Sequence, residues 1–423
     1  MVSTLKIAFL VYIIITVVAL LCYIPRITYF FWAFQKTKKL NNPVKNKLCI
    51  LIAARNEPVG IIHTLDGLLN QTYDRQLYEI VVVVSKFDDT TIDVVKTKYP
   101  SVELYVAQNT KSKGEALDNA VKHFFEEKRE YASYVLVDAD NIVKNNFVEE
   151  ANNAMMMEAG VIVFKKKVKN FESTNKKSRS LFCNCAGLVW IGVDDMGNKY
   201  RSSHNIACNM TGTGLMVKAE VLKAIGGFPC RTLTEDYELM CECMIRDIKT
   251  TYYEHAAVYT EEAVTHKEAS KRRIRWLKGF TQCQKIYKGK IKEQTFDGEE
   301  IKFQNFDFLY GILPLLLFAV GAILGIAVQL VSGIVLLILQ NNLCFLAFMY
   351  GGISLLFTYV LLVLYTLYQM IVAGKSYKIS FWSKVCVLFF NPFYISEYIL
   401  IYFKAKLSKE CSWEVVERVP FSV

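Results

Sequence analysis

The apolar residues of the middle of the chain are grouped into short runs that alternate with stretches of helical spacing. β-Branched runs predict strands at residues 48–53, 79–84, 102–106 and 134–137. Helices are predicted between and after them, at 61–69, 89–98, 116–127 and 237–245. Because alternating strands and helices form mainly parallel sheets covered by helices, we expect an α/β domain of the doubly wound type. We assign it to residues 41–300.

Apolar stretches on both sides of this domain in the sequence predict membrane helices. Residues 7–24 are uncharged and run into a further apolar and aromatic stretch without a small-residue cleavage site, so we expect an uncleaved anchor within residues 1–40. No charged residue and no His occurs from Phe308 to Gly374. That length accommodates two spans of roughly 20 residues each. We place this helix pair in residues 301–375, with its turn near Gln340.

The last part of the chain, residues 376–423, is apolar but interrupted. Lys384 and Glu397 lie within it, and Asn391-Pro392 is expected to break it into a helical pair. A re-entrant or interfacial pair, followed by a tail, keeps the lysines beyond Phe403 on the same side as the other basic segments. A full membrane crossing is the alternative.

The charge distribution predicts the orientation of the chain. Lys and Arg total 50 against 40 Asp and Glu, and they cluster at the exits of the apolar stretches. By the positive-inside rule, the α/β domain then lies in the cytoplasm and the N-terminus outside, in an integral protein of the plasma membrane. The net charge of +10 suits membrane lipids and a diphosphate. We expect no nucleic-acid partner, because no nucleic-acid-reading module accompanies the basic residues.

The 12 cysteines are interpreted as ordinary reduced thiols. Two CxC pairs occur, at residues 183–185 and 241–243, but no His or CxxC partner completes a zinc set.

Paired acidic residues follow the predicted fourth strand. Asp138 and Asp140 flank Ala139 directly after that strand, where ligands bind in open α/β sheets. Mg²⁺ or Mn²⁺ prefers carboxylate oxygens and neutralises the diphosphate of a nucleotide. A solvated turn is the competing interpretation, because DxD also occurs by chance.

A second acidic site is the segment Thr234-Glu235-Asp236, which follows a glycine-rich turn and precedes a predicted helix. A carboxylate in that place often only caps the helix. It also suits a general base that takes a proton from an acceptor hydroxyl.

The third candidate element is the basic segment 272–279, with the sequence Arg-Arg-Ile-Arg-Trp-Leu-Lys-Gly. One interpretation is a helix at the membrane surface with its Trp at headgroup level. The other is a site in which guanidinium groups bind the leaving diphosphate and Trp276 presents a flat face to a sugar ring.

The order of these motifs resembles family 2 glycosyltransferases of the GT-A fold, in the membrane-integrated branch of the cellulose, hyaluronan and poly-N-acetylglucosamine synthases. Asn56-Glu57 comes first, then Lys113-Gly114-Glu115, then Asp138-Ala139-Asp140. Gly212-Thr213-Gly214, Gly226-Gly227-Phe228, Thr234-Glu235-Asp236 and Arg-x-x-Arg-Trp follow in the same order. The resemblance covers residues 48–290.

The resemblance implies a role for each matching residue. It assigns the donor nucleotide and sugar to Asn56, Glu57, Asp88, Lys113, Asp138 and Arg275. It gives the metal to Asp140, and the acceptor to Gly212, Thr213, Gly214 and Trp276. Asp236 would be the catalytic base, with Glu235 beside it.

The implied reaction is transfer from a nucleoside-diphosphate sugar, first of all UDP-glucose or UDP-N-acetylglucosamine, to a glycan or lipid-linked acceptor. A single displacement would invert the anomeric centre and give a β-linkage. Two positions depart from the family. Arg272 stands in place of Gln, which favours a single transfer or a short product over a polymer, and Ser85 stands where many members have an Asp that Asp88 would replace. The competing hypothesis is a transport or scaffold protein whose α/β domain binds nucleotide without catalysis.

Overall fold

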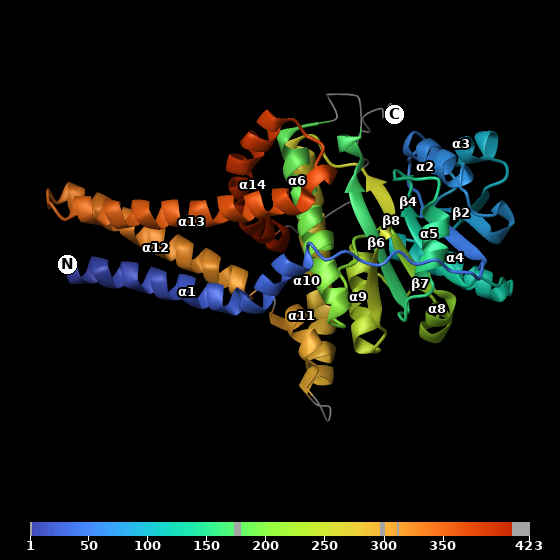
Figure 1. The fold of residues 1–423 in the computed structure, drawn as a ribbon, viewed down its shortest axis with the longest axis horizontal. Coiled ribbons are helices and arrows are strands. Elements are labelled where there is room, and N and C mark those ends of the chain that lie inside the picture. The colour runs from blue at the N-terminus through green and yellow to red at the C-terminus, as the bar shows by residue number, and fades with distance from the viewer. Residues whose placement is uncertain (1, 173–178, 297–300, 311–312, 408–423) are drawn as a thin grey trace.

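The computed structural model describes residues 2–172, 179–296, 301–310 and 313–407. Their central element is a sheet with the strand order β3-β2-β1-β4-β7-β6-β8-β5 (Figure 1). Strands β1, β2, β3 and β4 pair in parallel, whereas β7 is antiparallel to both β4 and β6. The strands are β1 Leu48–Ala53, β2 Tyr78–Val84, β3 Glu103–Val106, β4 Ser133–Asp138, β5 Ile142–Val143, β6 Val161–Val168, β7 Leu215–Lys218 and β8 Thr250–Thr260.

Helices cover both faces of this sheet. The first four strands and the helices between them agree with the sequence prediction, within two or three residues at most boundaries. The helices of the domain are α2 Gly60–Leu69, α3 Thr91–Lys98, α4 Lys113–Glu126, α5 Phe147–Ala154, α6 Leu181–Ile191, α7 Lys199–Ser203, α8 Ala219–Ile225, α9 Glu235–Ile245 and α10 His266–Phe296. A π-helical turn, Gly192–Asn198, joins α6 to α7.

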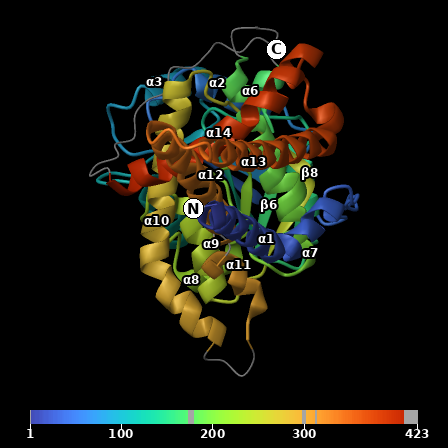
Figure 2. The same cartoon turned by 90° about the vertical axis from the view of Figure 1, so that its left-hand side faces the viewer.

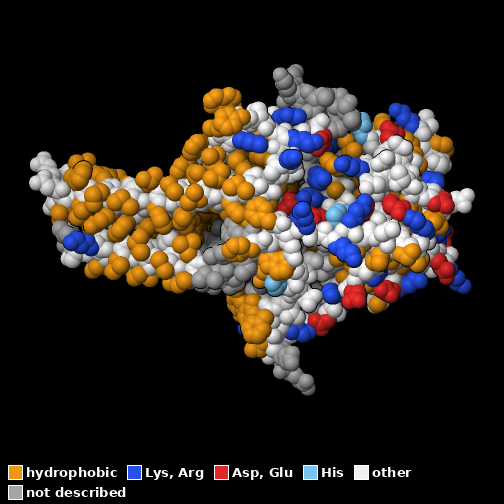
Figure 3. All heavy atoms as spheres, in the orientation of Figure 1, with side chains coloured by type: hydrophobic (Ala, Val, Ile, Leu, Met, Phe, Trp, Pro, Cys, Tyr) orange, Lys and Arg blue, Asp and Glu red, His pale blue; other side chains and the backbone are white. Residues whose placement is uncertain are grey.

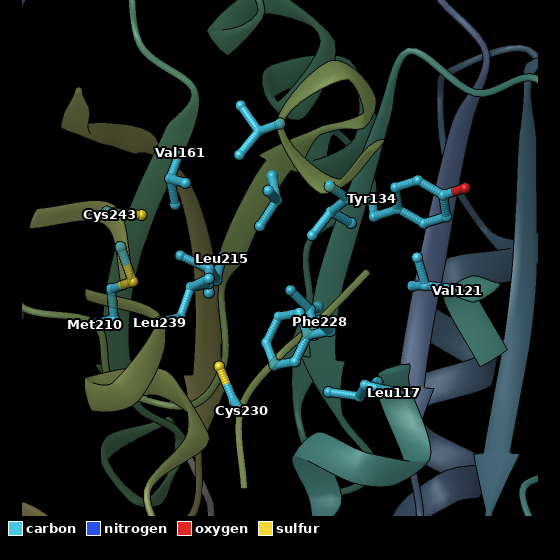
Figure 4. Close-up of a cluster of buried hydrophobic side chains, with 14 of the residues drawn as sticks. Leu117, Val121, Tyr134, Val161, Met210, Leu215, Phe228, Cys230, Leu239 and Cys243 are labelled. Carbon is cyan, nitrogen blue, oxygen red and sulfur yellow. The ribbon is translucent and has the colours of Figure 1, made fainter. Parts of the chain in front are cut away.

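The buried strands supply two hydrophobic cores because their side chains alternate between the faces. Leu51 and Leu136 belong to the core under α4, α8 and α9. Figure 4 shows part of this core, with Leu117 of α4 and Leu239 of α9 labelled. Ile52 of the next pleat belongs to the opposite core under α2, α3 and α5. Near-continuous apolar strands are what a sheet buried on both faces requires, and this explains why the β-branched runs predicted them.

A separate arm of long helices projects from the α/β domain. Helices α1 Val2–Trp32, α12 Leu313–Ile338 and α13 Cys344–Ala373 lie side by side in it (Figure 1). Its surface is almost entirely apolar, whereas charged side chains cover the domain (Figure 3). The expected helix pair is present, and the chain turns between Ile338 and Cys344.

Among the described residues, four helices are long and apolar enough to cross a membrane. Their apolar windows are Ser3–Leu21, Leu317–Ile338, Cys344–Ser376 and Phe381–Leu407. The first three coincide with the predicted anchor and helix pair.

The last of these helices, α14 (Phe381–Leu407), corrects one expectation. The sequence predicted a helical pair broken at Asn391-Pro392, but α14 continues through Pro392. The side chains around the proline satisfy polar groups there: Asn391 Nδ2 donates to Thr366 Oγ1 at 3.0 Å, and Ser396 Oγ donates to the Pro392 carbonyl at 2.8 Å. In the turn before the proline, the Phe389 carbonyl accepts from Tyr359 Oη at 2.9 Å, and proline inside a helix is tolerated where neighbouring helices bond the backbone in this way.

Helix α14 does not extend along the arm but lies at its base, against α6, α10 and α13 (Figure 1). Helix α10 runs along one whole side of the domain (Figure 2). Arg273 of α10 connects the two: it is 1% exposed, its Nη2 donates to Glu397 Oε2 at 2.7 Å, and its guanidinium stacks on Tyr394 and Tyr398. The interfacial or crossing state of α14 stays a prediction.

We expect Glu397→Ala to loosen α14, because it leaves the buried guanidinium of Arg273 without a countercharge. Breaking one partner of a buried ion pair costs about 3 kcal/mol. Amide hydrogen exchange along residues 381–407 should therefore accelerate. Glu172→Ala is the matched control, because it breaks the exposed Lys378–Glu172 pair, which contributes about 1 kcal/mol at most. Equal exchange in the two variants would show that the Arg273 contact does not hold α14.

Candidate active site

A cleft of about 1240 Å³ lies beyond the carboxyl ends of β1, β2 and β4. Its wall is completed by the start of α4, the start of α9 and the first turns of α10. Residues from all the predicted motifs except Gly226-Gly227-Phe228 line it. Those residues are Asn56, Glu57, Asp88, Lys113, Asp138, Asp140, Gly212, Glu235, Asp236, Arg275 and Trp276.

The ammonium of Lys113 joins three segments that are distant in the sequence. Its Nζ lies 2.6 Å from Asp138 Oδ1, 2.9 Å from Glu235 Oε1 and 2.7 Å from the carbonyl oxygen of Gly212. Burial lowers the pKa of Lys113, but Asp138 and Glu235 outweigh it and hold the pKa well above its usual value. Lys113 is therefore a permanent cation that holds two carboxylates in one wall of the cleft.

Local sequence at the start of α4 fixes the position of Lys113. Ser112 caps the helix by accepting from the Glu115 amide at 3.1 Å, and Glu115 accepts from the Lys111 amide at 2.6 Å. Gly114 lets the helix approach closely, because a Cβ there would lie 2.2 Å from the carbonyl oxygen of Cys230.

Asp138 and Asp140 stand at the end of β4. The side chain of Asp138 is 35% exposed, and burial followed by the nearby charge of Asp140 raises its pKa, against the lowering effect of Lys113. The Asp140 loop also meets the start of α2: a Cβ at Gly60 would lie 3.2 Å from Asp140 Cα and 3.1 Å from Glu57 Oε2. Glu57 thus borders the same part of the cleft as the acidic pair.

Asp236 faces the cleft from the first turn of α9. Loss of solvent around its carboxyl, and then the neighbouring Glu235, raise the pKa of Asp236 to about 7. It lies next to the glycine loop, since a Cβ at Gly212 would be 3.5 Å from Asp236 Oδ2. A carboxyl group with this pKa can change its protonation state near neutral pH.

The residues after β1 and β2 bond to each other. Asn56 has a positive φ of 51°, and its amide donates to both carboxylate oxygens of Asp89 at 3.0 Å. The Glu57 amide donates to Thr91 Oγ1 at 3.0 Å. Asp88 is exposed at the rim of the cleft. The carboxylate of Asp89 is thus occupied by the backbone amide of Asn56, whereas Asp88 is exposed to the cleft and can contact a ligand.

Helix α10 brings Arg275 and Trp276 to the opposite wall. Gly279, one turn further, makes this possible, because a Cβ there would lie 2.3 Å from Thr234 Oγ1. The basic segment therefore packs directly on the start of α9. This geometry favours the site interpretation for the face that carries Arg275 and Trp276.

Two of the expected acceptor residues lie beneath the cleft instead of in its lining. Thr213 is 1% exposed, and its Oγ1 accepts from the Asp138 amide at 3.0 Å. Gly214 has φ +64° and continues the sheet, with its amide donating to the Leu136 carbonyl at 2.9 Å. Both support the acidic pair from behind, so of the three loop residues Gly212 alone lines the cleft.

Sequence reasoning missed a group of residues on the side of the cleft nearest the arm. Lys166, Trp190 and Glu262 line it, from β6, α6 and the loop after β8. Trp190 Nε1 donates to Glu262 Oε1 at 2.6 Å, and the Trp190 ring meets the Trp276 ring edge-on at 5.5 Å. No motif signalled them: Lys166 stands among lysines, Trp190 stands in an apolar run, and the pair Glu261-Glu262 matched no predicted motif.

Residues 46–279 match the family described as "Glycosyltransferase like family 2". The match covers more than half of the chain, and the chain belongs to this family. The family resemblance inferred from the motif order is therefore confirmed, and the α/β domain has the GT-A fold.

Two similar proteins bear on this assignment. The chain is 25% identical over 277 residues to "Probable glycosyltransferase YdaM" of Bacillus subtilis (strain 168). The aligned region covers 63% of this chain and 64% of that protein, so this chain spans less than two thirds of the relative. A mannosyltransferase from Pyrobaculum calidifontis, solved in complex with GDP-Man and Mn²⁺, superposes with a TM-score of 0.59 at 16% identity, over 90% of this chain and 98% of that one. At this identity the likeness shows the fold alone.

We expect Gly114→Ala to destabilise the protein by about 1–3 kcal/mol, because the added methyl forces α4 away from Cys230. The melting temperature of the full chain in detergent measures the effect. Gly289→Ala in α10 is the control: nothing lies within 4 Å of its Cβ position, and Ala stabilises a helix interior by about 1 kcal/mol relative to Gly. An unchanged melting temperature for Gly114→Ala would mean that this close approach does not exist.

Proposed function

We propose that the protein is an inverting glycosyltransferase that moves a sugar from a nucleoside-diphosphate donor to a glycan or lipid-linked acceptor. The observation that carries this proposal is the meeting of Asp138, Glu235 and Gly212 at Lys113, with Asp236 beside them in the same cleft. Three segments that are distant in the sequence converge on this ammonium, at the carboxyl ends of the strands, where α/β sheets bind their ligands. A domain that only binds nucleotide gives no role to Asp236, which supports the enzyme over the silent scaffold.

The donor occupies the part of the cleft bordered by β1, β2 and β4. Asn56, Glu57 and Asp88 surround the nucleotide in this proposal, and Arg275 lies opposite Asp138 to contact the diphosphate. A fixed guanidinium suits two phosphate oxygens. UDP-glucose and UDP-N-acetylglucosamine are the first donors to test.

The acidic pair fits a divalent cation that the donor itself helps to hold. Among the described residues no preformed set of three ligand side chains exists. Mg²⁺ and Mn²⁺ at phosphate sites are commonly bound by one or two carboxylates together with phosphate oxygens and water. Asp140 would hold the ion, because Asp138 already bonds Lys113. Such an ion supplies charge stabilisation to a departing diphosphate.

Asp236 acts as the general base in this proposal. Its carboxyl faces the cleft on the acceptor side, between Gly212 and the Trp276 wall, and its pKa suits proton transfer near neutral pH. Glu235 is bound to Lys113 and positions the start of α9. One base and one displacement invert the anomeric centre, which gives a β-linkage from an α-linked donor.

The apolar arm anchors this site at a membrane. Helices α1, α12 and α13 form the bilayer part in our proposal, with the domain on the cytoplasmic side of the plasma membrane. The lysines of α10 and those flanking α13 support this orientation. The cleft then opens next to the lipid surface, where a membrane-bound acceptor can reach Asp236.

We expect Asp236→Asn to lower transfer by about 100- to 10,000-fold, the usual contribution of a general base, while UDP affinity stays near that of the wild type. Asp140→Asn should instead weaken Mn²⁺-dependent UDP binding. Radiolabelled donors with membranes that contain the full chain measure the first effect, and UDP titration with and without Mn²⁺ measures the second. The proposal is wrong if the wild type turns over none of the common donors.

The pH dependence follows from the raised pKa of Asp236. The base is active only when ionised, so kcat/KM should rise as the pH increases through about 7 and then level off. The free energy of unfolding changes in the opposite direction. The raised pKa of Asp236 contributes stability that is fully present below pH 3.8 and is lost as the pH rises through about 7. Steady-state rates at a fixed Mn²⁺ concentration between pH 5 and 9 test this, and a flat profile across pH 7 contradicts the assignment.

A further inference from the structure

Strand β6 carries consecutive lysines whose surroundings differ. Lys165 Nζ lies 2.5 Å from Asp195 Oδ1, and Lys169, just after the strand, lies 2.8 Å from Glu261 Oε2. Lys167 sits 5.5 Å from the centre of the Tyr259 ring. Lys166, on the opposite face of the strand from its two neighbours, enters the cleft.

The ammonium of Lys166 has an aromatic platform but no acidic partner. It lies 3.7 Å from the centre of the Trp190 ring, and among the described residues it makes no salt bridge and donates no hydrogen bond. Its three donors are therefore available to groups that enter the cleft. Burial lowers the pKa of Lys166, and the more distant Glu262 and Asp138 act against this shift.

Such a cation is unfavourable in the absence of a ligand. Withdrawing a charge from water without pairing it destabilises a protein, and local departures of this kind concentrate at binding sites. Trp190 is itself held in place by its bond to Glu262 and its contact with Trp276. The platform is therefore rigid before any ligand arrives.

The position of Lys166 assigns it to the acceptor half of the cleft. Strand β7 separates β6 from β4, so Lys166 is set back from the donor side on which Asn56 and Asp88 lie. Its neighbours come from α6 and α10, and a small space lined by Trp190, Trp276, Tyr394 and Tyr398 continues from there towards α14 and the base of the arm. A group bound at Lys166 thus lies on the side of the cleft that faces α14, away from Asn56 and Asp88.

We propose that Lys166 and Trp190 form a subsite for an anionic oxygen group, a phosphate or a carboxylate, carried by the acceptor. This inference rests on the proposed glycosyl transfer, because it names the acceptor of that reaction. The ammonium binds the anion, and Trp190 keeps the ammonium in place and excludes water from one side. A phosphate would come from a lipid carrier and a carboxylate from an acidic sugar.

Binding of short acceptor probes to the full chain in phosphatidylcholine nanodiscs tests the inference. With UDP and Mn²⁺ present, calorimetric titration compares hexyl phosphate, hexyl glucuronide and the neutral hexyl glucoside. We expect one anionic probe to bind more tightly than the glucoside, and which one it is identifies the source of the anion. Lys166→Met should weaken that probe by about tenfold or more, whereas Lys166→Arg retains it.

Control variants separate this role from a structural one. Lys167→Met removes a neighbouring lysine that does not line the cleft and should leave probe binding unchanged. The melting temperature of Lys166→Met should not fall, because the variant removes an unpaired charge. If no anionic probe binds more tightly than the glucoside, or if Lys166→Met has no effect on it, the inference is wrong.

The same titrations distinguish a failure of the inference from a failure of the proposed function. Weakening of UDP itself by Lys166→Met, as strong as that of the probe, would assign the lysine to the donor diphosphate and overturn the acceptor subsite. Absence of UDP binding to the wild type would count against the glycosyltransferase proposal as a whole. UDP binding without an effect of Lys166 on any probe rejects this inference alone.

Discussion

The active-site cleft depends on one partly buried ammonium. Lys113 would be unfavourable in that wall by itself, and so would Asp138 and Glu235, because desolvated charges destabilise a fold unless they are paired and hydrogen-bonded. Together they satisfy one another and bind the Gly212 carbonyl as well. The cap of α4 and the close approach at Gly114 hold the ammonium at the point where these groups meet. The cleft is therefore formed before any substrate binds.

Much of the domain could be predicted from the sequence, because its strands are buried on both faces and its motifs follow strand ends. Asp138 was found in this way, since a carboxylate after an apolar run stands out, whereas Asp236 was found between a glycine-rich turn and a predicted helix. The antiparallel β7 was not predicted: its four residues, Leu215–Lys218, carry no signal of direction. Its insertion between β4 and β6 depends on pairings that only the folded sheet defines.

Other residues escaped prediction because their role depends on tertiary neighbours. Lys166 looks like its flanking lysines in the sequence, and only the positions of Asp195 and Trp190 distinguish it. Thr213 matched an acceptor motif but turned out to hold the Asp138 backbone. Pro392 suggested a break, yet α14 continues through it and Tyr359 of α13 bonds the carbonyl of Phe389 in the preceding turn. A motif thus locates a segment, and packing decides which of its side chains reach the ligand.

Gly279 lies on α10 less than two turns after Arg273, a separation of about 9 Å along the helix axis. At Arg273 the helix is bound to Glu397 of α14, and at Gly279 it contacts Thr234, the residue before Glu235 and Asp236. Because both contacts lie on one continuous helix, a movement of α10 at one contact also moves the other. If α14 lies in or on the bilayer, as the sequence predicts, a change in bilayer thickness or curvature that shifts α14 would also move the start of α9, where Glu235 and Asp236 lie.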